Sequence, residues 1–151
     1  MSEPANVLVV AHQTAATPAL LEAVQERARS GPARFHLVVP RRAHGMDKLV
    51  DPQHSSEDEA RAALESALPK LEEAAGAPVS GSIGDAEPLY AIQDAINLGH
   101  YEEIIISTLP RRLSRWLRLD LVSKTRALGL PVTHVELQTH DPAVVAAGPS
   151  S

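Results

Sequence analysis

The sequence has 151 residues, of which 44% are hydrophobic and 22% are charged, values typical of one globular domain with a full-sized core. Aromatic residues make up only 3% of the chain, which argues against a protein that stacks nucleic-acid bases on aromatic rings. The net charge of −5 argues against general nucleic-acid binding. Because there is no cysteine, the chain has neither disulfides nor thiolate metal ligands.

The first residues of the chain lack the features of a secretory signal. Met1 is followed by Ser-Glu-Pro, without the basic start and the long apolar region of a signal peptide. No apolar run approaches the ~18 residues that are needed to span a bilayer. We therefore expect a cytoplasmic protein that has no membrane partner.

The chain opens with a strand, a helix and a second strand. Val7 to Ala11 is a continuous apolar run, typical of a central strand in a parallel sheet. Thr17 followed by Pro18 predicts an N-cap and a first helical residue, and this helix should end at Gly31. Phe35 to Val39 predicts the second strand.

A long polar connection and a second helix follow. The connection covers residues 40–56 and contains His44 and His54, whose spacing is not diagnostic of a metal site, so we expect a solvated loop and no bound metal. The helix is predicted from Ser56 to the residue before Gly76, with a kink at Pro69.

The second half of the chain repeats the alternation. Val79 to Ile83 contains small residues and predicts a strand at the sheet edge. Asp85 is predicted to cap a helix whose apolar residues recur at core spacing up to Ile96. Glu103 to Ser107 and Val132 to Leu137 predict the fourth and fifth strands.

Strand and helix patterns that alternate five times predict one fold class. Each parallel strand pair needs a crossover, so we expect a single doubly wound, five-stranded parallel α/β sheet of the Rossmann-like kind. The domain is predicted to cover residues 1–139, and the small polar residues of 140–151 predict a flexible tail.

The segment after the fourth strand is the predicted functional site. Ser107 and Thr108 end the strand and are followed by a cluster of arginines. Residues 111–126 contain five Arg and one Lys against one acid, so this segment carries +5 and the remainder of the chain −10. A helix start leaves backbone N–H groups unpaired, and together with this charge it suits a small anion better than a long polyanion.

The chain resembles the universal stress protein family over nearly its whole length, up to Leu137. The resemblance lies in VLVVA before a helix, FHLVV, GDAEPLYAIQDAINLGHYEEIIIS and the final strand after LGLPV. It implies a UspA-like, stress-response protein with strand order 3-2-1-4-5 and a ligand crevice beyond the carboxyl ends of strands 1 and 4. It also implies a homodimer paired through the fifth strand, where Val132, Val135 and Leu137 offer apolar side chains.

The chain departs from the family's ATP-binding pattern, which is Gly-x2-Gly-x9-Gly-Ser/Thr after the fourth strand and an aspartate at the end of the first. The motif positions are occupied here by Ser107, Pro110, Asp120 and Leu121, and the aspartate position by His12. Pro110 lacks an N–H, and the carboxylate of Asp120 is expected to cap the helix that begins at Leu121. ATP bound in the family's manner is therefore disfavoured.

Arginine side chains could bind an anion in place of the missing glycines, because the guanidinium fork pairs with two oxygens at once. The residues that we expect to contact a nucleotide or small anion are His12, Thr14, Gly84, Ser107, Thr108, Arg111, Arg112, Ser114 and Arg115. The competing interpretation of the arginines is a solvated helical face with a salt bridge to Asp120 or Glu102, worth ~0–1 kcal/mol. We expect Trp116 to have a packing role.

Three functions are compatible with these residues. The first is a non-enzymatic binding or regulatory module that forms a homodimer, with no certain cofactor and no catalytic residue. The second is an enzyme of the adenine-nucleotide α-hydrolase-like group, although the loop of residues 12–16 has no glycine and the chain has no Gly-x-Ser-x-Gly elbow. The third is a structural dimer in which the crevice near His12 and Ser107 is closed.

Overall fold

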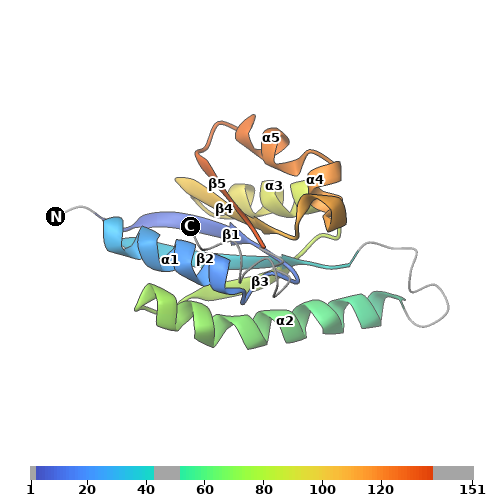
Figure 1. Ribbon diagram of the computed structural model, residues 1–151, viewed down its shortest axis with the longest axis horizontal. Coiled ribbons are helices and arrows are strands. Elements are labelled where there is room, and N and C mark those ends of the chain that lie inside the picture. Colours follow the sequence, from blue (N-terminus) through green and yellow to red (C-terminus); the bar gives the residue numbers. More distant parts are fainter. Residues whose placement is uncertain (1–2, 43–51, 138–151) are drawn as a thin grey trace, which may run out of the picture.

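Five parallel strands form one sheet in the order β3-β2-β1-β4-β5, which confirms the predicted strand order. The computed structural model describes residues 3–42 and 52–137, without the side chains of 52–56 (Figure 1). The strands are β1 (Ala5–Val10), β2 (Ala33–Pro40), β3 (Ser80–Gly84), β4 (Glu103–Thr108) and β5 (Val132–Glu136). The expected loop residue His44, the side chain of His54 and the expected tail over 140–151 lie outside the described residues.

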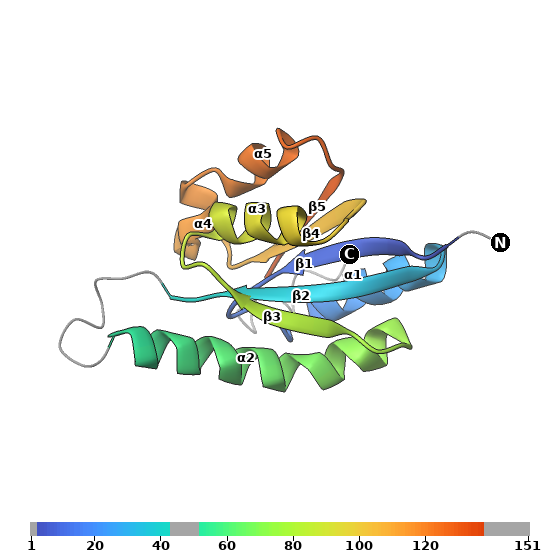
Figure 2. The same cartoon turned by 180° about the vertical axis from the view of Figure 1, so that it is seen from behind.

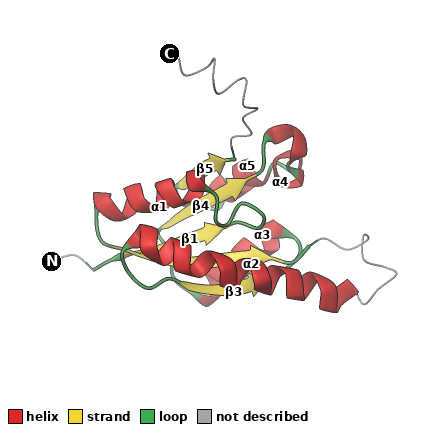
Figure 3. Ribbon diagram, turned by 60° about the horizontal axis from the view of Figure 1, so that its bottom comes forward, coloured by secondary structure: helices red, strands yellow, loops and turns green. Residues whose placement is uncertain are grey.

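Helices cover both faces of the sheet. The elements α1 (Pro18–Ser30) and α2 (Pro52–Ala75) pack side by side on one face, which Figure 3 brings forward. The other face carries α3 (Pro88–Leu98), α4 (Arg115–Arg118) and α5 (Leu121–Arg126), which lie above the sheet in Figures 1 and 2. A short 3₁₀ turn, η1 (Arg111–Leu113), links β4 to α4. None of the described helices is long and apolar enough to cross a membrane.

The sheet separates two hydrophobic cores. Val7 and Val9 face α1 and α2, whereas Leu8 and Val10 face α3 and α5. All four side chains are fully buried, because a central parallel strand is covered on both faces. Full burial of each such side chain contributes about 1.5–3 kcal/mol to the stability of the fold. An apolar run of this kind therefore favours the centre of the sheet, where β1 is covered on both faces.

Prolines mark the starts of the three longer helices. Thr17 caps α1 as predicted, since its Oγ1 accepts a hydrogen bond from the N–H of Leu20 at 3.5 Å. The predicted cap at Asp85 is wrong, because α3 begins at Pro88 and Asp85 instead accepts from the N–H of Glu87 at 2.8 Å. Proline disfavours helical backbone in the residue before it, which delays the helix start.

The second helix begins four residues before its predicted start. It starts at Pro52 instead of Ser56 and continues through Pro69 to Ala75. Gly76 follows with a φ of 71°, the left-handed conformation that ends many helices. The predicted edge position of β3 is confirmed.

Candidate functional site

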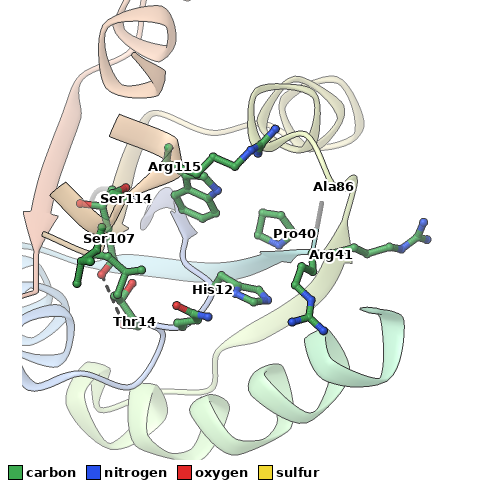
Figure 4. Close-up of a pocket in the computed structure, with 14 residues that line it drawn as sticks. His12, Thr14, Pro40, Arg41, Ala86, Ser107, Ser114 and Arg115 are labelled. Atoms are coloured by element: carbon green, nitrogen blue, oxygen red, sulfur yellow. Dashed lines mark hydrogen bonds between the residues drawn. The ribbon is translucent and has the colours of Figure 1, made fainter. Parts of the chain in front are cut away.

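A cavity of about 420 Å³ lies at the carboxyl ends of β1, β2 and β4 (Figure 4). Its walls come from the last residues of these strands and the residues that follow them, from the turn before α3 and from the segment of η1 and α4. In Figure 4, Ser107, Ser114 and Thr14 gather on one side, Arg41 and Ala86 lie on the other, and His12 stands between them. A volume in the range of roughly 300–1,000 Å³ is typical of small-molecule sites.

The cavity brings together most of the residues that the sequence proposed as ligand contacts. His12, Thr14, Ser107, Thr108, Ser114 and Arg115 line it, and Gly84, Arg111 and Arg112 do not. The six that line the cavity share one property, which is their place at or after the carboxyl end of a central strand or in the segment that follows β4.

Gly84 has a packing role. Its carbonyl accepts a hydrogen bond from the N–H of Arg41 at 3.1 Å. A Cβ atom at this position would lie 2.8 Å from both the Cβ of Ala91 and the Cγ1 of Val38. The missing side chain thus permits the close approach of α3 to the sheet and explains the glycine without a ligand.

The η1 turn directs two of the predicted arginines away from the cavity. Arg111 and Arg112 are exposed in this turn, which closes through the N–H of Leu113 and the carbonyl of Pro110 at 2.8 Å. The N–H of Arg111 donates to Oε2 of Glu136 at 3.1 Å, so the carboxylate of a β5 residue holds the turn.

The floor of the cavity is formed by buried hydroxyl residues. Ser107 is 1% exposed, and its Oγ donates to the carbonyl of Thr14 at 3.5 Å, which ties the end of β4 to the loop after β1. Thr14 is 2% exposed, and its Oγ1 has no hydrogen-bond partner within the described part of the chain. The same is true of Nε2 of His12.

Burial lowers the pKa of His12 below its ordinary value. A smaller influence from the carboxylate of Glu59 acts in the opposite direction, and the guanidinium of Arg42 adds to the lowering. Burial thus favours the neutral imidazole of His12, which can donate one hydrogen bond and accept another.

Thr108 connects the cavity to the edge strand. Its Oγ1 is hydrogen-bonded to Nε2 of His134 at 2.8 Å, and its carbonyl accepts from the N–H of Leu137 at 2.8 Å. Burial lowers the pKa of His134; the carboxylate of Glu136 opposes this shift, and the guanidinium groups of Arg126 and Arg111 add to it.

Two cavity arginines were missed by the sequence interpretation. Arg41 and Arg42 follow β2 directly and line the cavity together with Arg115. The signal was present, because the carboxyl ends of adjacent parallel strands meet at one edge of the sheet, the same rule that selected His12. Arg42 is paired with Glu59 at 3.1 Å and Arg115 with Glu87 at 3.4 Å.

Trp116 serves both packing and the cavity. It is partly buried and packs against the core between the sheet and α3, as predicted, and it also lines the cavity together with Leu109 and Leu113. The site therefore offers an apolar wall beside its polar floor.

The predicted cap at α5 is wrong. Asp120 stands at the N-cap position, but its side chain makes no capping hydrogen bond. Its φ of 60° and ψ of 38° are left-handed, whereas a capping side chain needs an extended backbone to reach the first amides of the helix. The helix starts through main-chain atoms, with the N–H of Lys124 donating to the carbonyl of Asp120 at 3.1 Å.

Among the described residues, no group of three or more His, Asp or Glu side chains could hold a metal ion. No family model matches the sequence. No protein of curated function matches it either.

Solved structures of universal stress proteins match the fold. A family member from Burkholderia pseudomallei has a TM-score of 0.62 and 17% identity, over 86% of this chain and 94% of that one. The universal stress protein from Archaeoglobus fulgidus in complex with dAMP has a TM-score of 0.56 and 18% identity, over 89% and 99%. A family member from Arabidopsis thaliana with AMP bound has a TM-score of 0.57 and 14% identity, over 93% and 99%. At these identities the likeness establishes a shared fold.

Proposed function

From its universal stress protein fold, we propose that this chain is a non-enzymatic binding or regulatory module of the cytoplasm. Its ligand is a nucleotide or another small anion, bound in the cavity at the ends of β1 and β4. One observation carries this proposal: the cavity is lined by Arg41, Arg42 and Arg115 and by four hydroxyl side chains, and no carboxylate is among its described lining residues.

The chemistry of the walls supports a ligand with an anionic group and a ring. Guanidinium groups pair with phosphate or carboxylate oxygens. The indole of Trp116 and the side chain of Leu113 supply apolar surface against which a planar ring can pack. The similar structures from Archaeoglobus fulgidus and Arabidopsis thaliana contain dAMP and AMP, respectively, ligands of this kind.

The cavity also favours a binding module over a structural dimer with a lost site. A lost site should be filled by side chains near His12 and Ser107, yet both residues line a cavity of about 420 Å³. The Oγ1 of Thr14 and Nε2 of His12 lack protein partners among the described residues, and buried polar atoms of this kind are costly unless something completes their hydrogen bonds.

Calorimetric and thermal-shift titrations test this function. AMP, cyclic AMP, ATP, phosphate and citrate are titrated into the wild type and into an Arg41→Ala/Arg115→Ala variant. We expect at least one ligand to bind the wild type, and binding to be lost in the variant because two cavity cations are removed. A ligand at ~100 times its Kd should add ~2.7 kcal/mol to the free energy of unfolding.

The matched control is an Arg29→Ala/Arg34→Ala variant. It removes the same charge from exposed residues at the end of α1 and the start of β2. These residues lie near the amino ends of the strands, whereas the cavity lies at their carboxyl ends. Binding should be retained in this control. The proposal fails if none of the five ligands binds, or if the cavity variant binds as tightly as the control.

A further inference from the structure

We propose that Glu136 is a specificity-determining residue, whose carboxylate behind the η1 turn makes the cavity favour ligands with one phosphate over di- and triphosphates. This inference rests on the proposed function and deepens it by naming the charge class of the ligand. It differs from the expectation from sequence, in which the carboxylate at this corner was that of Asp120, capping the helix that begins at Leu121.

The backbone of the turn has few donors to offer a phosphate chain. Pro110 has no N–H, and the N–H of Leu113 donates to the carbonyl of Pro110 at 2.8 Å. The N–H of Ser114 donates to the carbonyl of Arg111 at 3.3 Å. The N–H of Arg111 is held by Oε2 of Glu136 at 3.1 Å, so a protein carboxylate already occupies the place of an anion.

Glu136 lies close enough to the cavity to act on a ligand there. Arg111, which it contacts, is two residues from Leu109 and two from Leu113, and both of these line the cavity. Two residues of extended chain span at most about 7 Å. A phosphate chain that extends along this wall therefore approaches the carboxylate, and the repulsion grows with each added phosphate.

The cations of the cavity are largely compensated by neighbouring acids. Arg42 pairs with Glu59 at 3.1 Å and Arg115 with Glu87 at 3.4 Å. The three cavity arginines and these two carboxylates together carry a net charge of +1. This charge matches a ligand with one anionic group, whereas a triphosphate would have to displace the protein's own carboxylates.

The test compares AMP, ADP and ATP by calorimetry, without magnesium and at one ionic strength. In the wild type we expect affinity to fall in the order AMP, ADP, ATP. Glu136→Gln removes the charge but keeps a carbonyl acceptor for the N–H of Arg111. We expect this variant to bind ATP about threefold to tenfold more tightly, with AMP affinity changed by less than about twofold.

Two further variants complete the design. Glu73→Gln makes the same change in total charge at an exposed residue about 21 Å along α2 from Glu59, and should leave the ATP-to-AMP ratio unchanged. Glu87→Gln releases Arg115 from its partner and should also raise ATP affinity relative to AMP, which tests the inference independently of the turn. Circular dichroism checks that each variant is folded.

The outcomes separate the inference from the proposed function. AMP binding with ATP equal or tighter in the wild type would overturn the inference and leave the proposed function standing. An unchanged ATP-to-AMP ratio in folded Glu136→Gln would also overturn it, whatever the result for Glu87→Gln. If no ligand binds at all, the proposed function fails and the inference fails with it.

Discussion

Three partly buried histidines have pKa values below the ordinary value, and burial is the main cause in each case. They are His12, His36 and His134. His36 lies between two hydroxyls, with Nδ1 2.7 Å from Oγ of Ser80 and Nε2 2.9 Å from Oγ of Ser82. A histidine whose folded-state pKa is lowered binds a proton more readily in the unfolded chain.

We therefore expect the free energy of unfolding to fall as the pH is lowered. The loss begins near the unfolded-state pKa of about 6.5 and is complete below the folded-state values, because in that window only the unfolded chain takes up the protons. The urea midpoint should be lower at about pH 5.5 than at about pH 7.5. The His36→Asn variant should lack the part of this decrease in the urea midpoint that is due to His36.

His100→Gln provides the control for this measurement, since the side chain of His100 is 85% exposed. It should retain the pH dependence of the wild type. An equal change in the midpoint for wild type and His36→Asn would show that His36 does not contribute.

Gly84 sets the distance between α3 and the edge strand β3. A methyl group there would lie 2.8 Å from two neighbouring atoms, on Ala91 and on Val38, and neither is the end of a flexible side chain. Gly84→Ala should therefore lower the free energy of unfolding by about 1–3 kcal/mol through overpacking. Urea denaturation measures this change.

Gly31→Ala is the matched control. A Cβ atom at Gly31 would meet only Nη1 of Arg27, at an ordinary contact distance of 3.8 Å, so the cost should stay within about 0.5 kcal/mol. Equal stability of both variants would mean that α3 can shift away from β3 without loss.

The open edge of β5 is the surface through which we propose that two copies pair. The carbonyl of Pro131 accepts from the N–H of Ile104 at 3.0 Å, and the N–H of Leu137 donates to Thr108 at 2.8 Å. In a parallel strand the main-chain groups of alternate residues face the same neighbouring strand. Pro131 and Leu137 face β4, so His134, three residues from each, directs its main-chain groups to the outer edge. Val132 and Val135 pack partly against opposite cores and stay partly exposed, so both main chain and side chains of this strand are available for pairing.

The dimer predicts a selective effect of proline at position 134. His134→Pro and His134→Ala both lose the hydrogen bond to Thr108, but only proline removes the outward N–H and crowds an added strand. In sedimentation experiments we expect a dimer for the wild type and His134→Ala, and a monomer for His134→Pro. A monomeric wild type, or a dimeric proline variant, would contradict pairing through this edge.

Short-range chemistry in the sequence by itself indicated the α/β fold and several of the residues that line the cavity. The apolar run of β1, the Thr17 cap and the alternation of strand and helix patterns were sufficient for a parallel α/β sheet, because each depends on neighbouring residues. The strand order was expected from the resemblance to the universal stress protein family. The hydroxyls at the end of β4 and His12 after β1 were found because parallel strands present their carboxyl ends at one edge.

Only the tertiary structure decided which charges meet at that edge. Arg41 lines the cavity because β2 lies beside β1, and Glu136 holds the η1 turn because β5 lies beside β4. Asp120 fails to cap α5 because its backbone is left-handed where the chain turns from α4 into α5. These features depend on residues that are distant in sequence or on packing, so local sequence patterns do not predict them.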